Sequence, residues 1–158
     1  MALVFTGSLA KFHRELSHIP DLLAGTEHLE SFRKTSQYRA WENSLLYISR
    51  ELLMSKIKDD CGVLIEYKLP ATSRRVDFII TGHDSTGTPG FVIIELKQWS
   101  EAKAVKDKPG VVVANTSGSH RGETNHPSYQ AWSYRMFLDN MLDSVQKNHL
   151  HSVACACM

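Results

Sequence analysis

Two runs decide the fold: RRVDFII at 74–80 and FVIIELKQW at 91–99, joined by the turn-rich segment GHDSTGTPG at 82–90. Branched and aromatic residues dominate both runs, a composition that favours β-strands, and Gly, Pro, Asp and Ser bound them. A third run of the same kind, VLIEYKL at 63–69, precedes them across the turn at 70–73. Three strands joined by short connections predict an antiparallel meander.

Charged residues interrupt the last two of these strands. Side chains alternate along a strand, so Glu95 and Lys97 of IIELK are expected on one face. The connecting hairpin has its midpoint at Thr86, and symmetric pairing about that residue sets Asp77 opposite Glu95. Two opposed carboxylates repel each other, a cost that is explained if a divalent cation binds between them. Such oxygen ligands predict Mg²⁺ or Mn²⁺ as the cofactor.

This arrangement fits hydrolysis of a phosphodiester bond. Magnesium and manganese usually keep several waters and accept phosphate oxygens. Lys97 would lie beside that water, where it could orient the water, help to deprotonate it, or offset charge on the phosphate. The sequence therefore predicts an Mg/Mn-dependent nuclease with Asp77, Glu95 and Lys97 as catalytic residues.

A purely structural alternative stands beside this hypothesis. Glu95 and Lys97 would then be a same-face ion pair, and Asp77 would bond to Arg74 or Arg75. The apolar residues before Glu95 indicate a buried central strand, where unpaired charge is costly. We therefore favour a functional role.

Helical periodicity surrounds the meander. Steps of three and four in the apolar residues predict a helix over 37–57, and residues 8–34 predict one or two shorter helices. His126 and Pro127 open a further helix that runs to about 142. The segment 111–115 is expected to be a short strand or the stem of a flap, and the tail from 150 a last strand. The order αβββαβ predicts an α/β fold in which helices flank a central mixed sheet.

Bulk properties limit the function classes. The 158 residues suit one domain over 1–158, with 42% hydrophobic and 22% charged residues. The net charge of +1 gives no overall attraction for a polyanion, so contact with nucleic acid must come from local clusters or another domain. We expect a cytoplasmic protein without membrane contact, because the sequence shows no secretion signal and no apolar run approaching roughly 18 residues. Its three cysteines predict neither a disulfide framework nor a zinc site.

Gln130 and Tyr134 lie four residues apart at the start of the second long helix, and so share one helical face. The series D, then ExK, then QxxxY, on strand, strand and helix, resembles the PD-(D/E)xK nuclease superfamily, particularly its RecB-like branch. The resemblance implies a restriction-endonuclease-like core. It also implies that Gln130 and Tyr134 position substrate, and that Asp77, Glu95 and the Leu96 carbonyl bind metal.

An acidic residue on the first core helix often completes such sites. Glu42 in AWENSLLYI is in the corresponding place, and we favour it. Glu66 in IEYKLP is the competing candidate. Trp99, His120 and Arg121 are expected to line the substrate path, although Trp99 would equally suit the core.

Five strings carry a narrower resemblance: WENSL, IEYKLP, RRVDFIITGHD, VIIELKQW and HPSYQAWSY. They look like the N-terminal nuclease domain of bacterial schlafen-like nuclease-helicase or ATPase proteins. That resemblance implies action on DNA, with RNA as the other substrate, in DNA processing or phage defence. Val76 stands where the superfamily name has Pro, and no Walker A loop occurs. We therefore expect a truncated form, or a partner that supplies the motor.

Two other functions compete with catalysis. A catalytically silent module could keep the nuclease fold to bind nucleic acid or protein, although intact Asp77, Glu95 and Lys97 argue against this. An ordinary structural domain would use the same charges as salt bridges. The sequence leaves open strand preference, endonuclease or exonuclease action, the number of metals, and whether the chain forms a homo-oligomer.

Overall fold

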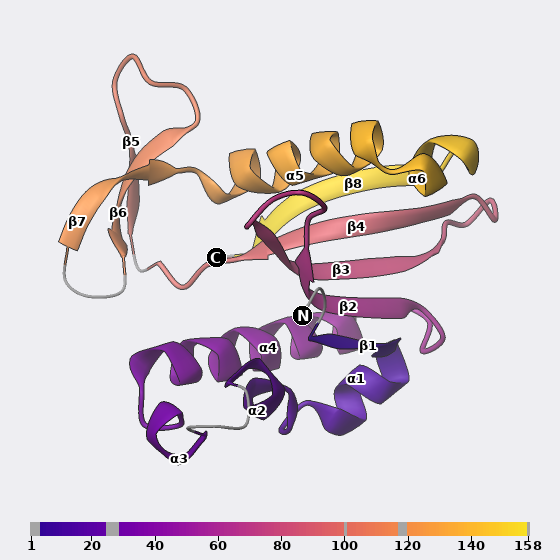
Figure 1. The fold of residues 1–158 in the computed structure, drawn as a ribbon, viewed down its shortest axis with the longest axis horizontal. Helices are drawn as coiled ribbons and strands as arrows, with labels where there is room; N and C mark the ends of the chain where they lie inside the picture. Colours follow the sequence, from indigo (N-terminus) through magenta and orange to yellow (C-terminus); the bar gives the residue numbers. More distant parts are fainter. Residues whose placement is uncertain (1–3, 25–28, 100, 117–119, 158) are drawn as a thin grey trace.

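A five-stranded sheet forms the centre of the molecule, and helices cover both of its faces (Figure 1). The computed structural model describes residues 4–24, 29–99, 101–116 and 120–157. On one face lie α1 (Leu9–Glu15), α2 (Ile19–Ala24) and α4 (Ser36–Met54), with the short α3 (Leu29–Phe32) between α2 and α4 in the chain and away from the sheet. The other face carries α5 (Pro127–Met141) and α6 (Asp143–Lys147).

The sheet has the strand order β1-β2-β3-β4-β8. The predicted meander is confirmed, because β2 pairs with β3 and β3 with β4, both antiparallel. The predicted last strand is also confirmed, and it lies parallel to β4. The bounds are β1 (Phe5–Ser8), β2 (Gly62–Lys68), β3 (Arg75–His83), β4 (Pro89–Leu96) and β8 (His151–Cys157). The mixed α/β architecture agrees with the expectation from sequence.

The β3–β4 hairpin has the predicted register. Its pairs run from His83↔Pro89 to Phe78↔Ile94, so they are symmetric about Thr86. The Asp84 carboxylate accepts hydrogen bonds from the backbone N–H groups of Thr86 and Thr88, which fixes the tip. One position beyond Phe78↔Ile94, this register brings Asp77 opposite Glu95.

Caps and apolar spacing account for the two long helices. The Thr35 hydroxyl accepts a hydrogen bond from the Tyr38 N–H at the start of α4. At the start of α5, the His126 ring accepts a hydrogen bond from the Ser128 N–H, and Pro127 lies in the first turn.

Among the described residues, no helix combines the length and apolarity needed to cross a membrane.

Two apolar cores lie on opposite faces of the sheet. One packs α1 and α4 against the sheet and includes Phe12, Leu45, Ile65 and Phe78. The other packs α5 against the opposite face and includes Ile79, Ile93, Ala131, Tyr134 and Leu138. Apolar residues on both faces explain the nearly continuous hydrophobic runs of β3 and β4.

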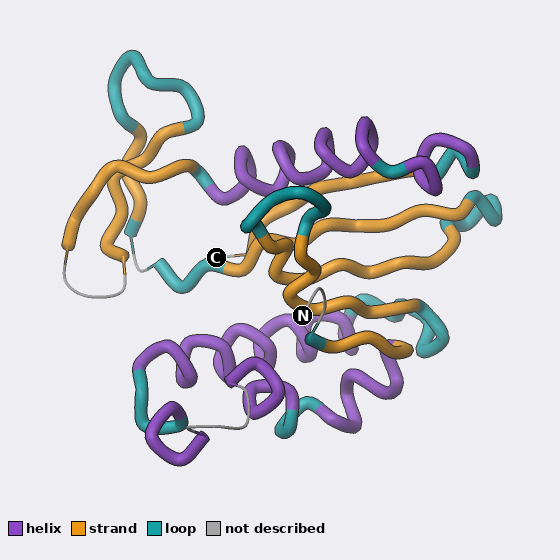
Figure 2. The backbone as a smooth tube through the Cα atoms, viewed as in Figure 1, coloured by secondary structure: helices purple, strands orange, loops and turns teal. Residues whose placement is uncertain are grey.

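Several elements differ from the prediction. A separate antiparallel sheet, β5 (Ala102–Ala104), β6 (Val111–Thr116) and β7 (His120–Asn125), projects beyond the main sheet near the start of α5 (Figure 2). Only β6 was suggested by the sequence, because β5 and β7 are polar and lack an apolar face. The sequence did not predict the edge strand β1, because its four residues show no strand pattern and only their backbone pairing with β2 makes them a strand. The strand expected over 91–99 is β4, and it ends at Leu96. Lys97, Gln98 and Trp99 therefore follow the strand and are not part of it.

Candidate active site

Asp77 and Glu95 lie together near one end of the β3–β4 ladder. The Asp77 carboxylate accepts a hydrogen bond from the Leu96 N–H, with Oδ2 and N 2.9 Å apart. Just after Leu96, the Lys97 N–H donates to the Cys157 carbonyl of β8 at 3.0 Å. The backbone that carries Glu95, Leu96 and Lys97 is therefore held from both sides.

Glu95 is fully buried, with 0% of its side chain exposed, and its two carboxylate oxygens differ. Oε1 accepts from Gln130 Nε2 at 2.5 Å and lies 2.7 Å from Lys97 Nζ. Gln130 Nε2 also donates to the Tyr134 hydroxyl at 2.8 Å. Oε2 is buried and has no hydrogen-bond partner among the described residues. An unsatisfied charged oxygen is costly, so Oε2 has unused capacity to bind a donor or a cation.

The pKa values reflect this crowding of charge. Burial, the negative charge of Asp77 and a hydrogen bond to the Asp77 carboxyl group raise the pKa of Glu95 to about 7, although Lys97 opposes the shift. Burial also raises the pKa of Asp77, against the Leu96 N–H and Lys97. A divalent cation would favour the ionised form of both carboxylates, and its binding would release protons.

Lys97 is the positive partner of the carboxylates, and its side chain is 27% exposed. Burial lowers its pKa, but the hydrogen bond and charge of Glu95, with the charge of Asp77, outweigh this and leave the pKa raised. Lys97 is therefore an ammonium at neutral pH. This state suits electrostatic stabilisation of a phosphate better than removal of a proton from water.

Glu66 lies beside Asp77 across the β2–β3 pair. The backbone pairs Ile65↔Phe78 and Tyr67↔Val76 leave Glu66 and Asp77 between them. Glu66 has φ of 56°, which is the left-handed region and is unusual for a residue other than Gly. Burial and the charge of Asp77 raise its pKa, and Arg75 lies 3.5 Å away as a counter-charge. Arg75 thus pairs with Glu66, and Asp77 bonds to the Leu96 N–H.

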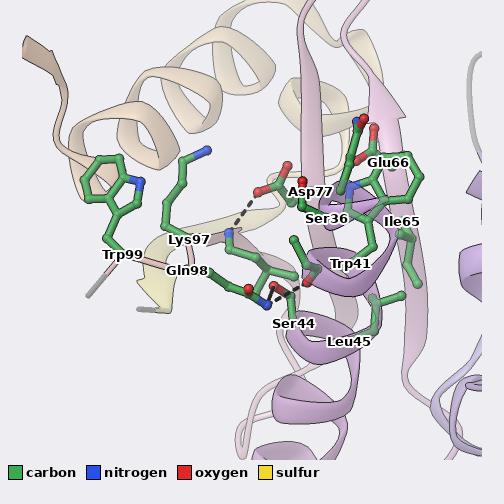
Figure 3. Close-up of a pocket in the computed structure, with 13 residues that line it drawn as sticks. Ser36, Trp41, Ser44, Leu45, Ile65, Glu66, Asp77, Lys97, Gln98 and Trp99 are labelled. Carbon is green, nitrogen blue, oxygen red and sulfur yellow. Dashed lines mark hydrogen bonds between the residues drawn. The ribbon is translucent and has the colours of Figure 1, made fainter. Parts of the chain in front are cut away.

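A cavity of 480 Å³ opens beside these groups, between α4 and the end of the sheet. Figure 3 shows Asp77, Lys97 and Glu66 in its wall, with Trp99 beyond Lys97 and Trp41 beside Glu66. Glu95 does not line the cavity, and its carboxylate pairs with Lys97, which does. Asp77 and Lys97 are therefore the members of the predicted triad that line the cavity.

Gln98 ties the wall of the cavity to α4. Its side-chain NH₂ donates to the Ala40 carbonyl at 2.7 Å and to the Ser44 hydroxyl at 3.1 Å. These bonds fix the segment after β4 that contains Lys97. Sequence reasoning missed Gln98, because a side chain that bonds to a backbone carbonyl 58 residues away leaves no periodic signal.

Of the other residues predicted for the site, some lie near Glu95 or the cavity and others do not. Gln130 and Tyr134 join the cluster, and Trp99 lines the cavity and is only partly buried. Glu42 does not join them, because it is exposed on α4 and does not line the cavity. The side chains of His120 and Arg121 lie outside the part of the chain that the structure describes. Glu66, on β2, lines the cavity in place of Glu42, on α4.

Comparison of the chain with family models, with curated proteins and with solved structures gives no match.

The donor set fits a hard divalent cation. Glu95 Oε2 is a buried, unpartnered oxygen, and Asp77 and the Leu96 carbonyl are further oxygen donors of the type that Mg²⁺ and Mn²⁺ prefer. Within the described ranges, no group of three or more His, Cys, Asp or Glu side chains forms a ready metal cluster. Magnesium needs only one or two carboxylates, since water and phosphate complete its shell.

Proposed function

We propose that this chain is a metal-dependent nuclease that hydrolyses phosphodiester bonds of DNA, with RNA as the other candidate substrate. The observation that carries the proposal is the buried carboxylate of Glu95, which faces Asp77, pairs with Lys97 and keeps Oε2 unpartnered. A strand that stabilised only the fold would gain by replacing these groups with apolar residues. The restriction-endonuclease-like core and the PD-(D/E)xK relationship are parts of this proposal.

Asp77, Glu95 and the Leu96 carbonyl would hold Mg²⁺ or Mn²⁺. When bound, the cation would supply Lewis acidity toward a phosphate oxygen and lower the pKa of a water molecule. Gln130 orients the Glu95 carboxylate through Oε1 and is itself held near the Tyr134 hydroxyl. Lys97, on the cavity wall, offsets the negative charge that develops on the phosphate as water adds to phosphorus and the ester oxygen leaves.

Glu66 takes the place first expected for Glu42 in this proposal. It lines the cavity next to Asp77, and its backbone conformation costs about 1–3 kcal/mol. Such conformations gather at functional sites, so we assign Glu66 to the acidic cluster. An associated motor domain or ATPase partner is also part of the proposal, and it rests on the resemblance of WENSL, VIIELKQW and HPSYQAWSY to nuclease-helicase proteins.

The test is cleavage of labelled DNA and RNA in Mg²⁺, Mn²⁺ or EDTA. We expect cleavage to require the cation, and Asp77→Asn and Lys97→Ala to lower its rate by at least about 100-fold, the scale of lost electrostatic groups. Asp60→Asn is the matched control, because Asp60 is exposed and precedes the opposite end of β2. Its rate should equal that of the unmodified chain.

The same assay distinguishes the two glutamates. Glu66→Gln should slow cleavage, and Glu42→Gln should leave the rate within about twofold, as expected of an exposed side chain outside the cavity. A chain that binds no cation and cleaves no substrate would instead be the binding module considered above.

A further inference from the structure

The walls of the cavity carry aromatic side chains on both sides of the proposed reactive groups. Trp99 lies beyond Lys97, and Trp41 lies beside Asp77 and Glu66 on the other side (Figure 3). Both indoles are partly exposed. Trp41 is backed by Phe32, with ring centroids 5.4 Å apart, so its position is fixed.

The cavity has the size of a small-ligand site. Its volume of 480 Å³ lies within the range of about 300–1,000 Å³ that such sites have. A second hollow of 210 Å³ adjoins it and shares Ser44, Leu96, Lys97 and Gln98 with it. Tyr47, which is 51% exposed, lines this second hollow. Each of the two hollows is therefore lined by an aromatic ring of α4, and Gln98 lines both hollows.

Charge in the cavity favours bases over phosphates as the first contact. Glu66, Asp77 and Lys97 give the wall an excess of negative charge. Phosphates are repelled there unless a cation is bound, whereas the flat face of a base can stack on an indole. The bases of a duplex are already stacked on each other, so a duplex cannot use these rings without being opened.

We propose that the substrate of this site is a single-stranded polynucleotide, whose bases stack on Trp99 and Trp41 while one phosphate lies at Asp77 and Lys97. The inference rests on the proposed nuclease function. It adds the strand preference, which the catalytic groups alone do not determine. Double-stranded substrates should be processed only at single-stranded ends or gaps.

Binding is tested first, by fluorescence anisotropy of a labelled twelve-nucleotide thymidine strand and of a blunt hairpin duplex, with Ca²⁺ as an oxygen-binding cation. We expect the single strand to bind at least about tenfold more tightly. Trp99→Ala should weaken this binding by about tenfold, which corresponds to the loss of one stacked base. Trp99→Phe should retain most of the affinity.

Trp132→Ala is the matched control, because Trp132 is an exposed tryptophan, 47% accessible, on α5 outside the cavity. It should bind both probes as the unmodified chain does. Equal affinities for strand and duplex, or equal losses in Trp99→Ala and Trp132→Ala, would overturn the inference.

Cleavage of the same two probes in Mg²⁺ separates this inference from the nuclease proposal. Cleavage of the single strand alone supports both. Cleavage of the blunt duplex at an equal rate contradicts the strand preference and leaves the nuclease intact. Tight single-strand binding without cleavage of either probe contradicts the nuclease and leaves the strand preference standing.

Discussion

Among the described residues, Glu95 is the one charged residue whose side chain is buried. Spacing alone placed it opposite Asp77, because the hairpin is symmetric about Thr86. Spacing could not show that Gln130 and Lys97 both contact Oε1, which leaves Oε2 buried without either of them. Nor could it decide between Glu42 and Glu66, since the left-handed conformation of Glu66 has no signature in residue type.

The burial of Glu95 predicts a pH-dependent stability in the absence of metal. Its pKa rises from 4.5 to about 7 on folding, so the folded state binds the extra proton between these values. The contribution of Glu95 to stability is then fully present below about pH 4.5 and is lost as the pH rises through about 7. The loss has an upper bound of about 3 kcal/mol, at 1.36 kcal/mol per pKa unit.

Urea denaturation from pH 5 to 8 in EDTA measures this effect. Glu95→Gln should flatten the decline in unfolding free energy, because glutamine does not titrate. Glu51→Gln, at an exposed position of α4, should decline as the unmodified chain does. An equally steep decline in Glu95→Gln would show that another group is responsible.

The candidate site depends on the contacts that other elements make with the C-terminal end of β4. Apolar runs and turn residues were sufficient to predict β2, β3, β4, α4 and α5. The same signals could not predict the contacts between elements that orient the segment after Leu96. Gln98 supplies one of them, a link to α4 at Ala40 and Ser44, and β8 supplies another through Cys157.

Removal of the Gln98 link should affect the site more than the fold. Gln98→Ala is expected to cost about 1 kcal/mol of stability and to lower Mn²⁺ affinity or cleavage about tenfold, as changes behind metal ligands do. Gln146→Ala is the control, since Gln146 Nε2 likewise donates to backbone, at the Asp139 and Asn140 carbonyls. It should lose similar stability and keep Mn²⁺ affinity. Titration calorimetry and urea denaturation give the two quantities, and equal Mn²⁺ affinity in both variants would contradict the positioning role.

At the scale of the whole molecule, the layered α/β arrangement followed from the order of predicted elements. The second sheet did not, because none of the described side chains of β5 and β7 belongs to either main core and the two strands carry no apolar alternation. The position of this sheet beyond the main sheet depends on how the elements are arranged in space, which local sequence patterns do not predict. The net charge of +1 is equally uninformative about the site, where the local balance is negative.

Cation binding should stabilise the molecule as a whole. A ligand that binds only the folded state adds about 2.7 kcal/mol at 100 times its dissociation constant, or roughly 5–10 °C in Tm for a domain of this size. Thermal unfolding at pH 8 should show this rise with Mn²⁺ in the unmodified chain and little rise in Asp77→Asn. An equal rise in both would place the cation elsewhere.

Because β8 is the last element in chain order, the contacts around Glu95 and Lys97 are completed late in synthesis. The chain makes β4, with Glu95 and Lys97, well before α5 and β8. Until both later elements have left the ribosome, Glu95 lacks Gln130 and the Lys97 N–H lacks the Cys157 carbonyl. Domains form as units once their last elements are available. Under the proposed nuclease function, a nascent chain would therefore not cleave nucleic acid until this segment has been translated.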